Sequence, residues 1–301
     1  MIDLLKTLVG EANALVDEPM KNHTSFKIGG NADFLVQPQT KKSLCDVIAF
    51  LRKENVPLTI IGNGSNLLVS DKGIRGVVVK ISQGMGSIEV DGKKITAKSG
   101  VSLTRLAQVA CSSGLTGLEF STGIPGTIGG AIYMNAGAYD HEIKEVVTST
   151  TYLNQNGEIK TLTGIREHKF DYRASVFQEN KDWIILESEF SLKPGDTSEI
   201  RAQMESILRK RKRKQPLDVP SAGSAFKRPK DGFASKLVDD AGLRGFRIGG
   251  AMVSDKHCGF VVNSGNATAN DVRELLKQVQ AEVFSQFGIM LEPEIKMVGD
   301  F

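Results

Sequence analysis

The pattern of apolar and polar residues predicts six helices, with apolar side chains at helical spacing in residues 2–16 and 42–54 and a long polar helix that starts at Thr197. The predicted helices span residues 2–16, 42–54, 102–113, 197–214, 234–241 and 270–287. Ser102 is placed to cap the third of them, and Gly114 follows its end. Asn270-Asp271, with Glu274, approximates an N-terminal cap for the last helix.

Short apolar runs that end at glycine, proline or asparagine predict strands between these helices. The predicted strands span residues 32–36, 58–61, 67–69, 76–81, 87–90, 95–98, 146–153, 159–162, 183–192, 259–263 and 289–298. Asp91-Gly92 and Asn156-Gly157 predict two hairpin turns. A break at Pro194-Gly195 and a helix stop at Pro216 place a domain boundary near residues 195–215.

Composition describes a globular protein rather than a membrane or secreted one. The chain has 301 residues, of which 40% are hydrophobic and 24% charged, and it has no apolar run long enough to span a bilayer. Its N-terminus carries acid as well as base and lacks a cleavage site, so we expect no secretory signal. The three cysteines, Cys45, Cys111 and Cys258, are too few and too widely spaced for a disulfide framework or a zinc site. We expect them in the core of a cytoplasmic protein.

Charge favours an anionic small ligand over nucleic acid. The net charge is only +3. Six consecutive cations, residues 209–214, end one predicted helix, but they cannot share one face, and cations at a helix C-terminus are favourable without a ligand. No aromatic residues interleave with them, as a single-strand binding platform would need. We expect most of them to be solvated and one or two to contact a ligand phosphate.

Two glycine-rich turns are the most informative stretches, because glycine loses more backbone entropy on folding than other residues. The longer turn, residues 123–137, holds five of the 31 glycines. The shorter, Gly62-Asn63-Gly64-Ser65-Asn66, can form a nest of amides for phosphate oxygens, although it matches neither the Rossmann nor the P-loop pattern. Together they predict a cradle for a dinucleotide. The alternatives are a plain turn between strands and a buried, glycine-packed crossover.

Three side chains outside the turns could carry chemistry, but each has an ordinary explanation. Arg173 could form a surface salt bridge, Ser224 could serve a turn, and Glu294 could face solvent from the last predicted strand. The histidines have no ligand spacing, so we expect no metal.

Seven motifs in order resemble the UDP-N-acetylenolpyruvoylglucosamine reductases (MurB), in their shorter, type II branch. The motifs are residues 22–30, 61–68, 123–130 with 135–137, 172–175, 220–226, 241–245 and 292–295. The resemblance implies an α+β fold with a two-lobed FAD-binding domain of the vanillyl-alcohol-oxidase (PCMH) type and a C-terminal α+β substrate-binding domain. The implied division is residues 1–20 for an N-terminal helix, 21–85 and 86–198 for the lobes, and 199–301 for the C-terminal domain.

The resemblance also implies non-covalent FAD, with NADPH as co-substrate. The residues implied for FAD are Ile61, Gly62, Asn63, Gly64, Ser65, Asn66, Leu67, Gly123, Pro125, Gly126, Thr127, Gly129, Gly130, Asn135, Ala136 and Gly137. Residues 139–142 depart from the glycine-rich continuation of the family. The final third lacks the segment whose tyrosine closes over substrate in longer members.

The implied reaction passes a hydride from NADPH through flavin to UDP-N-acetylglucosamine enolpyruvate. Arg173 would bind the carboxylate that gains enolate character, Ser224 would donate the proton, and Glu294 would act at the same site. Lys227, Lys236 and Arg244 are candidates for the diphosphate or the nicotinamide phosphate. We expect a monomer with no nucleic-acid or membrane partner.

Two other functions stay open from the sequence. One is another FAD-dependent oxidoreductase, such as an oxidase, on the same scaffold. The other is a non-catalytic nucleotide or nucleic-acid binder that uses the basic run. A yellow purified protein with flavin absorbance would argue against the binder.

Overall fold

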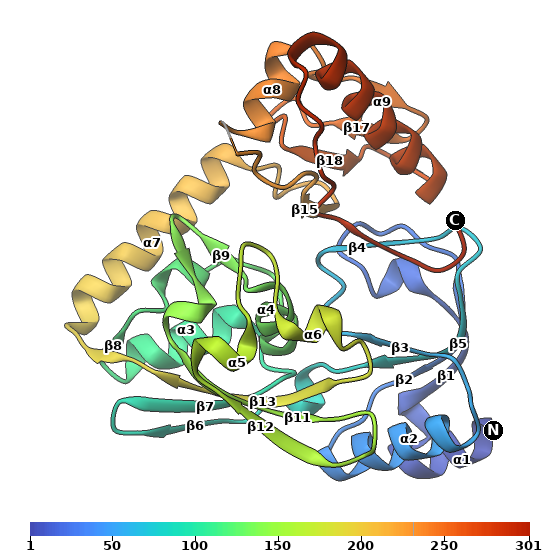
Figure 1. The fold of residues 1–301 in the computed structure, drawn as a ribbon, viewed down its shortest axis with the longest axis vertical. Helices are drawn as coiled ribbons and strands as arrows, with labels where there is room; N and C mark the ends of the chain where they lie inside the picture. Colours follow the sequence, from blue (N-terminus) through green and yellow to red (C-terminus); the bar gives the residue numbers. More distant parts are fainter. Residues whose placement is uncertain (231) are drawn as a thin grey trace. The chain divides into compact units, whose positions relative to one another are not determined.

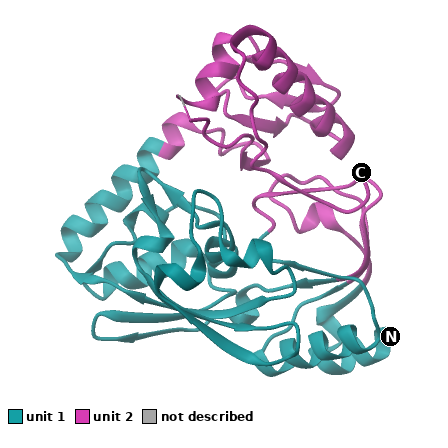
Figure 2. Ribbon diagram, viewed as in Figure 1, with its two compact units in different colours: residues 1–15, 35–63, 78–210 teal, residues 16–34, 64–77, 211–301 magenta. Residues whose placement is uncertain are grey.

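A computed structural model describes residues 1–230 and 232–301, which form two compact units (Figures 1 and 2). The first unit contains residues 1–15, 35–63 and 78–210, and the second contains residues 16–34, 64–77 and 211–301. Each unit is therefore assembled from segments that lie far apart in the sequence. The chain passes from the first unit to the second within the short glycine turn, between Asn63 and Gly64.

The first unit is built on a five-stranded antiparallel sheet with the strand order β12-β11-β13-β7-β6. Its strands are β6 (Ile88–Asp91), β7 (Lys94–Lys98), β11 (Val147–Leu153), β12 (Ile159–Thr163) and β13 (Ile184–Ser191). Its helices are α1 (Ile2–Val9), α2 (Lys41–Lys53), α3 (Leu103–Ser112), α4 (Ile128–Met134), α5 (Gly164–His168) and α6 (Val176–Glu179). One core joins β7 and β13 of the sheet to α3 and α4.

Short strands complete the first unit. They are β3 (Leu58–Ile61), β8 (Leu115–Thr116), β9 (Gly137–Ala138), β10 (His141–Glu142) and β14 (Lys193–Pro194). Single 3₁₀ turns occur in both units, at η1 (Glu11–Asn13), η2 (Met20–Asn22), η3 (Gln83–Met85), η4 (Glu119–Ser121) and η5 (Ile143–Glu145). The long helix α7 (Thr197–Lys214) leads out of this unit into the second.

The second unit contains a four-stranded antiparallel sheet with the order β15-β18-β17-β16. Its elements are β15 (Ser221–Ser224), α8 (Ala234–Asp240), β16 (Arg247–Ile248), β17 (Ala251–Val253), β18 (Phe260–Asn263) and α9 (Ala269–Phe287). Strand β4 (Leu67–Val69) pairs in parallel with β19 (Lys296–Val298). Phe26 and Leu68 pack in the same core as Val272 and Leu276 of α9. Segments from the first quarter of the chain thus share a core with the C-terminal region.

A further four-stranded sheet has the order β1-β2-β5-β3. Its strands β1 (Ala14–Pro19), β2 (Asn31–Val36) and β5 (Ile74–Lys80) each begin in one unit and end in the other. No helix among the described residues is long and apolar enough to cross a membrane.

Several local predictions are confirmed. The hydroxyl of Ser102 accepts a hydrogen bond from the amide of Arg105 (3.2 Å) and so caps α3. Both predicted hairpins form, because β6 pairs with β7 across Asp91-Gly92, and β11 pairs with β12 across Asn156-Gly157. Side-chain caps and two-residue turns are set by neighbouring residues, which explains why the sequence predicts them well.

The predicted helix over residues 2–16 is wrong in its second half. Helix α1 ends at Val9 because Gly10 adopts φ +89°, a left-handed conformation that glycine accommodates best. The amide of Gly10 still donates to the carbonyl of Lys6 (2.8 Å). The chain then makes a 3₁₀ turn and enters strand β1 at Ala14.

The predicted strand over residues 289–298 is also wrong, since only Lys296–Val298 forms a strand. Pro293 has no amide hydrogen to donate to a ladder. The segment before β19 instead runs beside the residues that follow β15. Lys227 donates its amide to the carbonyl of Glu292 (2.8 Å), and Glu294 donates its amide to the carbonyl of Ala225 (2.9 Å).

Three smaller expectations need correction. Helix α9 is capped by Thr268, whose hydroxyl accepts from the amide of Asp271 (3.0 Å), rather than by Asn270-Asp271 with Glu274. Cys45 is only half-buried, whereas Cys111 and Cys258 lie in the core as expected, and all three are free thiols. The loop expected at 220–226 contains strand β15.

Candidate active site

The two glycine-rich turns meet within the first unit. The side-chain amide of Asn63 donates to the carbonyl of Pro125 at 2.9 Å. Gly62 lies so close to Thr127 that a Cβ atom at position 62 would stand 2.4 Å from the Thr127 hydroxyl oxygen. This distance is too short for any side chain, so the close approach of the Thr127 side chain favours glycine at position 62. A dinucleotide cradle requires the two turns to lie close together, and these contacts place Gly62 and Asn63 against the longer turn.

The backbone N–H groups of the shorter turn are the candidate donors to an anion. Within their own units, no described backbone N–H group from Gly62 to Asn66 donates a hydrogen bond. The turn follows the buried end of β3 at Ile61 and leads into β4 at Leu67. Successive unpaired amides in a tight turn form the concave nest that phosphate oxygens prefer. The shorter turn is therefore a candidate nest for the diphosphate of a dinucleotide.

The longer turn contains helix α4 (Ile128–Met134) and packs against the segment between β7 and α3. The amide of Gly129 donates to the carbonyl of Ser99 (2.9 Å), and the hydroxyl of Thr127 caps the helix. The carbonyl of Gly126 accepts from the amide of Leu103 (3.0 Å), the first residue of α3. The start of α4 is thus held by protein contacts. Gly123 and Gly130 are at least partly accessible.

Asn135, expected to contact the cofactor, is fully buried and bonded to protein on both sides of its amide. Its nitrogen donates to the Glu142 carboxylate (3.1 Å) and to the carbonyl of Asp171 (2.9 Å), and its oxygen accepts from the amide of Lys144 (3.2 Å). These bonds tie the end of α4 to the turn that carries Arg173.

Arg173 stands in a tight turn in which Asp171 and Ala174 pair with each other. It adopts φ +53°, a sparsely populated conformation for a residue with a side chain. Its guanidinium lies 4.9 Å from the centre of the Tyr172 ring and donates to the carbonyl of Gly137 at 3.2 Å. The predicted catalytic arginine is thereby joined to the last residue of the long glycine turn.

In the second unit, Ser224 ends strand β15. It lies opposite Phe260 of β18, and the register of the two strands shifts between Ser221 and Ser224. Ser224 is partly accessible. Among the described residues, its hydroxyl takes part in no hydrogen bond within its unit.

Glu294 lies beside the same segment. Its amide donates to the carbonyl of Ala225, the residue after Ser224, at 2.9 Å. Its own carbonyl accepts from the side-chain amide of Asn66 at 3.1 Å. The second unit therefore brings together Ser224, Glu294 and one end of the shorter glycine turn, which are three predicted parts of the site.

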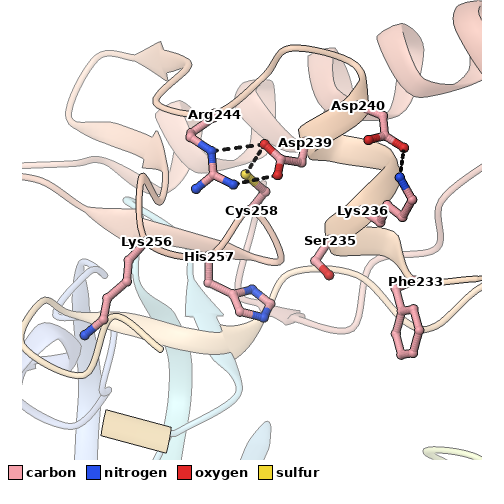
Figure 3. A pocket seen from close by; sticks show the side chains of 9 residues that line it. All are labelled: Phe233, Ser235, Lys236, Asp239, Asp240, Arg244, Lys256, His257 and Cys258. Carbon is pink, nitrogen blue, oxygen red and sulfur yellow. Dashed lines mark hydrogen bonds and ion pairs between the residues drawn. The ribbon is translucent and has the colours of Figure 1, made fainter. Parts of the chain in front are cut away.

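The three candidate cations for phosphate binding are each paired with an acid. Lys227 pairs with Glu292 (2.5 Å) and Lys236 with Asp240 (2.6 Å). The guanidinium of Arg244 makes two bonds to the Asp239 carboxylate, at 3.0 and 2.6 Å. Lys236 and Arg244 line one open pocket of about 340 Å³ (Figure 3).

The same pocket contains residues that the sequence did not single out. They are Phe233, Ser235, Lys256, His257 and Cys258. Burial raises the pKa of Cys258 to about 11, and the thiol donates to Asp239, so it is not a nucleophile at neutral pH. Burial lowers the pKa of His257. Only the closeness of Lys256-His257-Cys258 in the chain could have marked this cluster.

The basic run at the end of α7 is mostly solvated, as expected. Five of its six cations are exposed: Arg209, Lys210, Lys212, Arg213 and Lys214. Among the described residues, no group of three or more histidine, cysteine or acidic side chains could hold a metal ion.

Comparison with known proteins places these features in a family. The profile of an FAD-binding domain matches residues 32–163. The profile of the C-terminal domain of UDP-N-acetylenolpyruvoylglucosamine reductase matches residues 215–298. The reductase of that name from Caldanaerobacter subterraneus subsp. tengcongensis is 52% identical over 300 residues, covering 100% of this chain and 98% of the relative. The chain belongs to the UDP-N-acetylenolpyruvoylglucosamine reductase family.

Other members support the assignment over the whole length of this reductase. The UDP-N-acetylenolpyruvoylglucosamine reductase of Clostridioides difficile is 45% identical over 299 residues, covering 99% of this chain and 97% of the relative. The crystal structure of MurB from Thermus caldophilus superposes with a TM-score of 0.81 at 33% identity, covering 95% of this chain and 98% of that one. The reductase is an FAD-dependent oxidoreductase with the α+β fold and the FAD-binding domain that the resemblance implied.

Proposed function

We propose that this reductase uses NADPH and non-covalent FAD to reduce UDP-N-acetylglucosamine enolpyruvate to UDP-N-acetylmuramate, in the synthesis of peptidoglycan precursors. When bound, FAD supplies the hydride chemistry that links NADPH to the terminal vinyl carbon of the substrate. The observation that carries the proposal is the backbone bond from Glu294 to Ala225. This bond keeps the segments of two predicted catalytic side chains, Ser224 and Glu294, next to each other.

Arg173 would bind the carboxylate of the enolpyruvyl group. A guanidinium is planar, always charged and suited to two parallel bonds to a carboxylate. As the vinyl carbon gains a hydride, negative charge develops on the neighbouring carbon and on this carboxylate, and a fixed cation stabilises it. The bond from Arg173 to the carbonyl of Gly137 (3.2 Å) supports this role, because it anchors the side chain beside the long glycine turn.

Ser224 would donate the proton that completes the reduction. The neighbouring carbon takes this proton as the hydride adds to the terminal carbon, and the serine is reprotonated from solvent. A hydroxyl is a weak acid, so a strongly basic enolate and a site with little water must drive the transfer. Glu294 would act at the same carbon. In its protonated form it would donate a hydrogen bond to the enolate, and in its ionised form it would oppose the charge.

The pocket in Figure 3 supports a phosphate-binding role for Lys236 and Arg244. Lys227 lies nearer to Ser224 in the chain and would bind the same diphosphate, or the phosphate of the nicotinamide nucleotide. All three are paired with acids, so a ligand phosphate would have to compete with Glu292, Asp240 or Asp239.

We infer that the enzyme acts as a cytoplasmic monomer without nucleic-acid or membrane partners. Three free cysteines fit a reducing compartment. Size-exclusion chromatography with light scattering should give one species near 32.6 kDa. A dimer would contradict this inference.

The product of one turnover tests the proposed function. The purified protein should be yellow, and under anaerobic conditions it should oxidise one NADPH for each enolpyruvyl sugar consumed. Mass spectrometry should find a product heavier by two hydrogens. If NADPH is oxidised only when oxygen is admitted, the chain is an oxidase and the substrate assignment is wrong.

A further inference from the structure

Asn66, the last residue of the shorter glycine turn, bonds to the C-terminal segment on both sides of buried Ile295. Its side-chain amide donates to the carbonyl of Glu294 at 3.1 Å. Its own carbonyl accepts from the amide of Lys296 at 2.9 Å. All of these groups lie in the second unit. A side chain expected to contact the cofactor is thus turned toward the protein backbone at Glu294.

The peptide groups of Glu294 are held from two sides. Its amide donates to the carbonyl of Ala225, which follows Ser224 (2.9 Å), while its carbonyl accepts from Asn66. Together these bonds connect the turn, Glu294 and the Ser224 segment in one short chain of contacts. A shift of the Glu294 backbone would have to break at least one of them.

The side chain of Asn66 bonds to a carbonyl that no strand pairing reaches. Strand β19 begins only at Lys296, so the carbonyl of Glu294 lies outside the ladder with β4. Pro293, immediately before, has no amide hydrogen with which to fix the segment. A side-chain donor therefore takes the place of a ladder bond at this carbonyl.

We propose that Asn66 is a positioning residue, which sets the place of Glu294 relative to Ser224 for delivery of the proton to the substrate. The inference rests on the proposed function for the roles of Ser224 and Glu294, but the contact itself does not. Geometry matters at this step because a displacement of about 1 Å at a reacting group can cost about 100-fold in rate.

Asn63 of the same turn provides the contrast. Its side-chain amide donates to the carbonyl of Pro125, in the first unit. Asn63 therefore bonds one glycine turn to the other, whereas Asn66 bonds the shorter turn to the segment of Glu294. Their substitutions should therefore have different effects.

The test compares Asn66→Ala with Asn63→Ala and with Gln280→Ala. Gln280 donates its side-chain amide to the carbonyl of Leu291 (2.8 Å), so its loss removes a similar bond from the same C-terminal segment. A second variant, Asn66→Leu, keeps the side-chain volume and removes the donor. Stopped-flow absorbance follows reduction of the holoenzyme by NADPH and its anaerobic reoxidation by the enolpyruvyl sugar. FAD affinity and the hydrogen exchange of residues 292–296 are measured separately.

We expect both Asn66 variants to bind FAD and to be reduced by NADPH within about twofold of the wild type. Their reoxidation should be slower by about 10- to 100-fold, and the amide of Glu294 should exchange faster than in Gln280→Ala. Asn63→Ala should instead lose FAD affinity.

Two results would overturn the proposal. One is reoxidation and exchange at wild-type rates in the Asn66 variants. The other is a loss of FAD affinity equal to that of Asn63→Ala, which would make Asn66 a cofactor ligand. Failure of the wild type to be reoxidised by the sugar would refute the proposed function instead. In that case the hydrogen exchange of the Glu294 amide would still test the positioning role. An exchange rate in the Asn66 variants equal to that of the wild type would refute it.

Discussion

At the scale of single residues, His168 shows how burial selects one form of a titratable group. The ring is fully buried and stacks on Phe170 at 4.8 Å between ring centres. Its Nδ1 lies 2.7 Å from the carbonyl of Gly164, which can only accept a hydrogen bond, so Nδ1 carries the proton. Its Nε2 then accepts from the hydroxyl of Thr150 (2.9 Å), which in turn lies 3.1 Å from that of Ser188. The neutral ring satisfies every group in this cluster.

This cluster predicts a pH dependence of stability. Burial lowers the pKa of His168 in the folded state, so the unfolded chain binds the extra proton first. The stability that the neutral ring contributes is complete above about pH 6.5 and is lost as the pH falls below it. Urea unfolding between pH 5 and 8 should show a shallower slope for His168→Gln than for the wild type, by at most about 1.4 kcal/mol per pH unit. Equal slopes would show that the pKa of His168 does not differ between the folded and unfolded states.

Arg173, Ser224 and Glu294 became candidates only through the family resemblance, because local patterns alone do not separate them from ordinary surface or turn residues. Their contacts join distant positions, since Arg173 bonds to Gly137 across 36 residues and Asn66 bonds to Glu294 across 228. No periodicity encodes such a pair. For the same reason, the sequence could not show that the amide of Asn135 is occupied by protein.

At the scale of elements, the contact between the two glycine turns makes a specific prediction. In Gly62→Ala, the new methyl group would meet the hydroxyl oxygen of Thr127 at 2.4 Å. We expect a lower melting temperature and weaker FAD binding. The double variant Gly62→Ala/Thr127→Ala should recover part of both, because it removes the clashing oxygen.

Gly130→Ala supplies the control for this experiment. A methyl group there would lie at an ordinary 3.7 Å from the Thr127 hydroxyl, and alanine favours a helix more than glycine does. The melting temperature of its apoprotein should not fall. If Gly62→Ala is as stable as Gly130→Ala, the close approach of the two turns is not what requires glycine at position 62.

Helices and hairpins that depend on neighbouring residues were predictable. Strands that exist only through pairing with distant residues were not. Helices α2, α3 and α9 and both hairpins follow from periodicity, caps and turn residues. Strands β15, β16 and β17 were missed, because they are two to four residues long and exist only through pairing with one another and with β18. Pro293 indicates that the last strand is short, because proline has no amide hydrogen to donate to a ladder.

At the scale of the whole molecule, each unit gathers separated segments. Residues 16–34 and 64–77 join residues 211–301 in the second unit. Phe26 and Leu68 share a core with α9, and no local pattern in the sequence shows this grouping of distant segments. Sequence order alone therefore could not reveal which segments fold together.

The fold makes a prediction about the cofactor at this scale. A ligand that binds only the folded chain stabilises it by about 2.7 kcal/mol at 100 times its dissociation constant. For a chain of this size we expect a rise in melting temperature on the order of 5 °C when FAD is added to the deflavinated protein. Differential scanning fluorimetry would measure it, with riboflavin, which lacks the diphosphate, as the control. An equal shift with riboflavin would show that the amides of Gly62–Asn66 do not bind phosphate.

The central claim is that this chain reduces an enolpyruvyl sugar through flavin, with Ser224 as the proton donor. Anaerobic stopped-flow absorbance of wild type and Ser224→Ala tests it most directly, because it separates the two half-reactions. NADPH should bleach the flavin of both proteins at the same rate. The enolpyruvyl sugar should then reoxidise the wild type rapidly and the variant about 10²- to 10⁴-fold more slowly. Equal reoxidation of the two proteins, or none in the wild type, would contradict the claim.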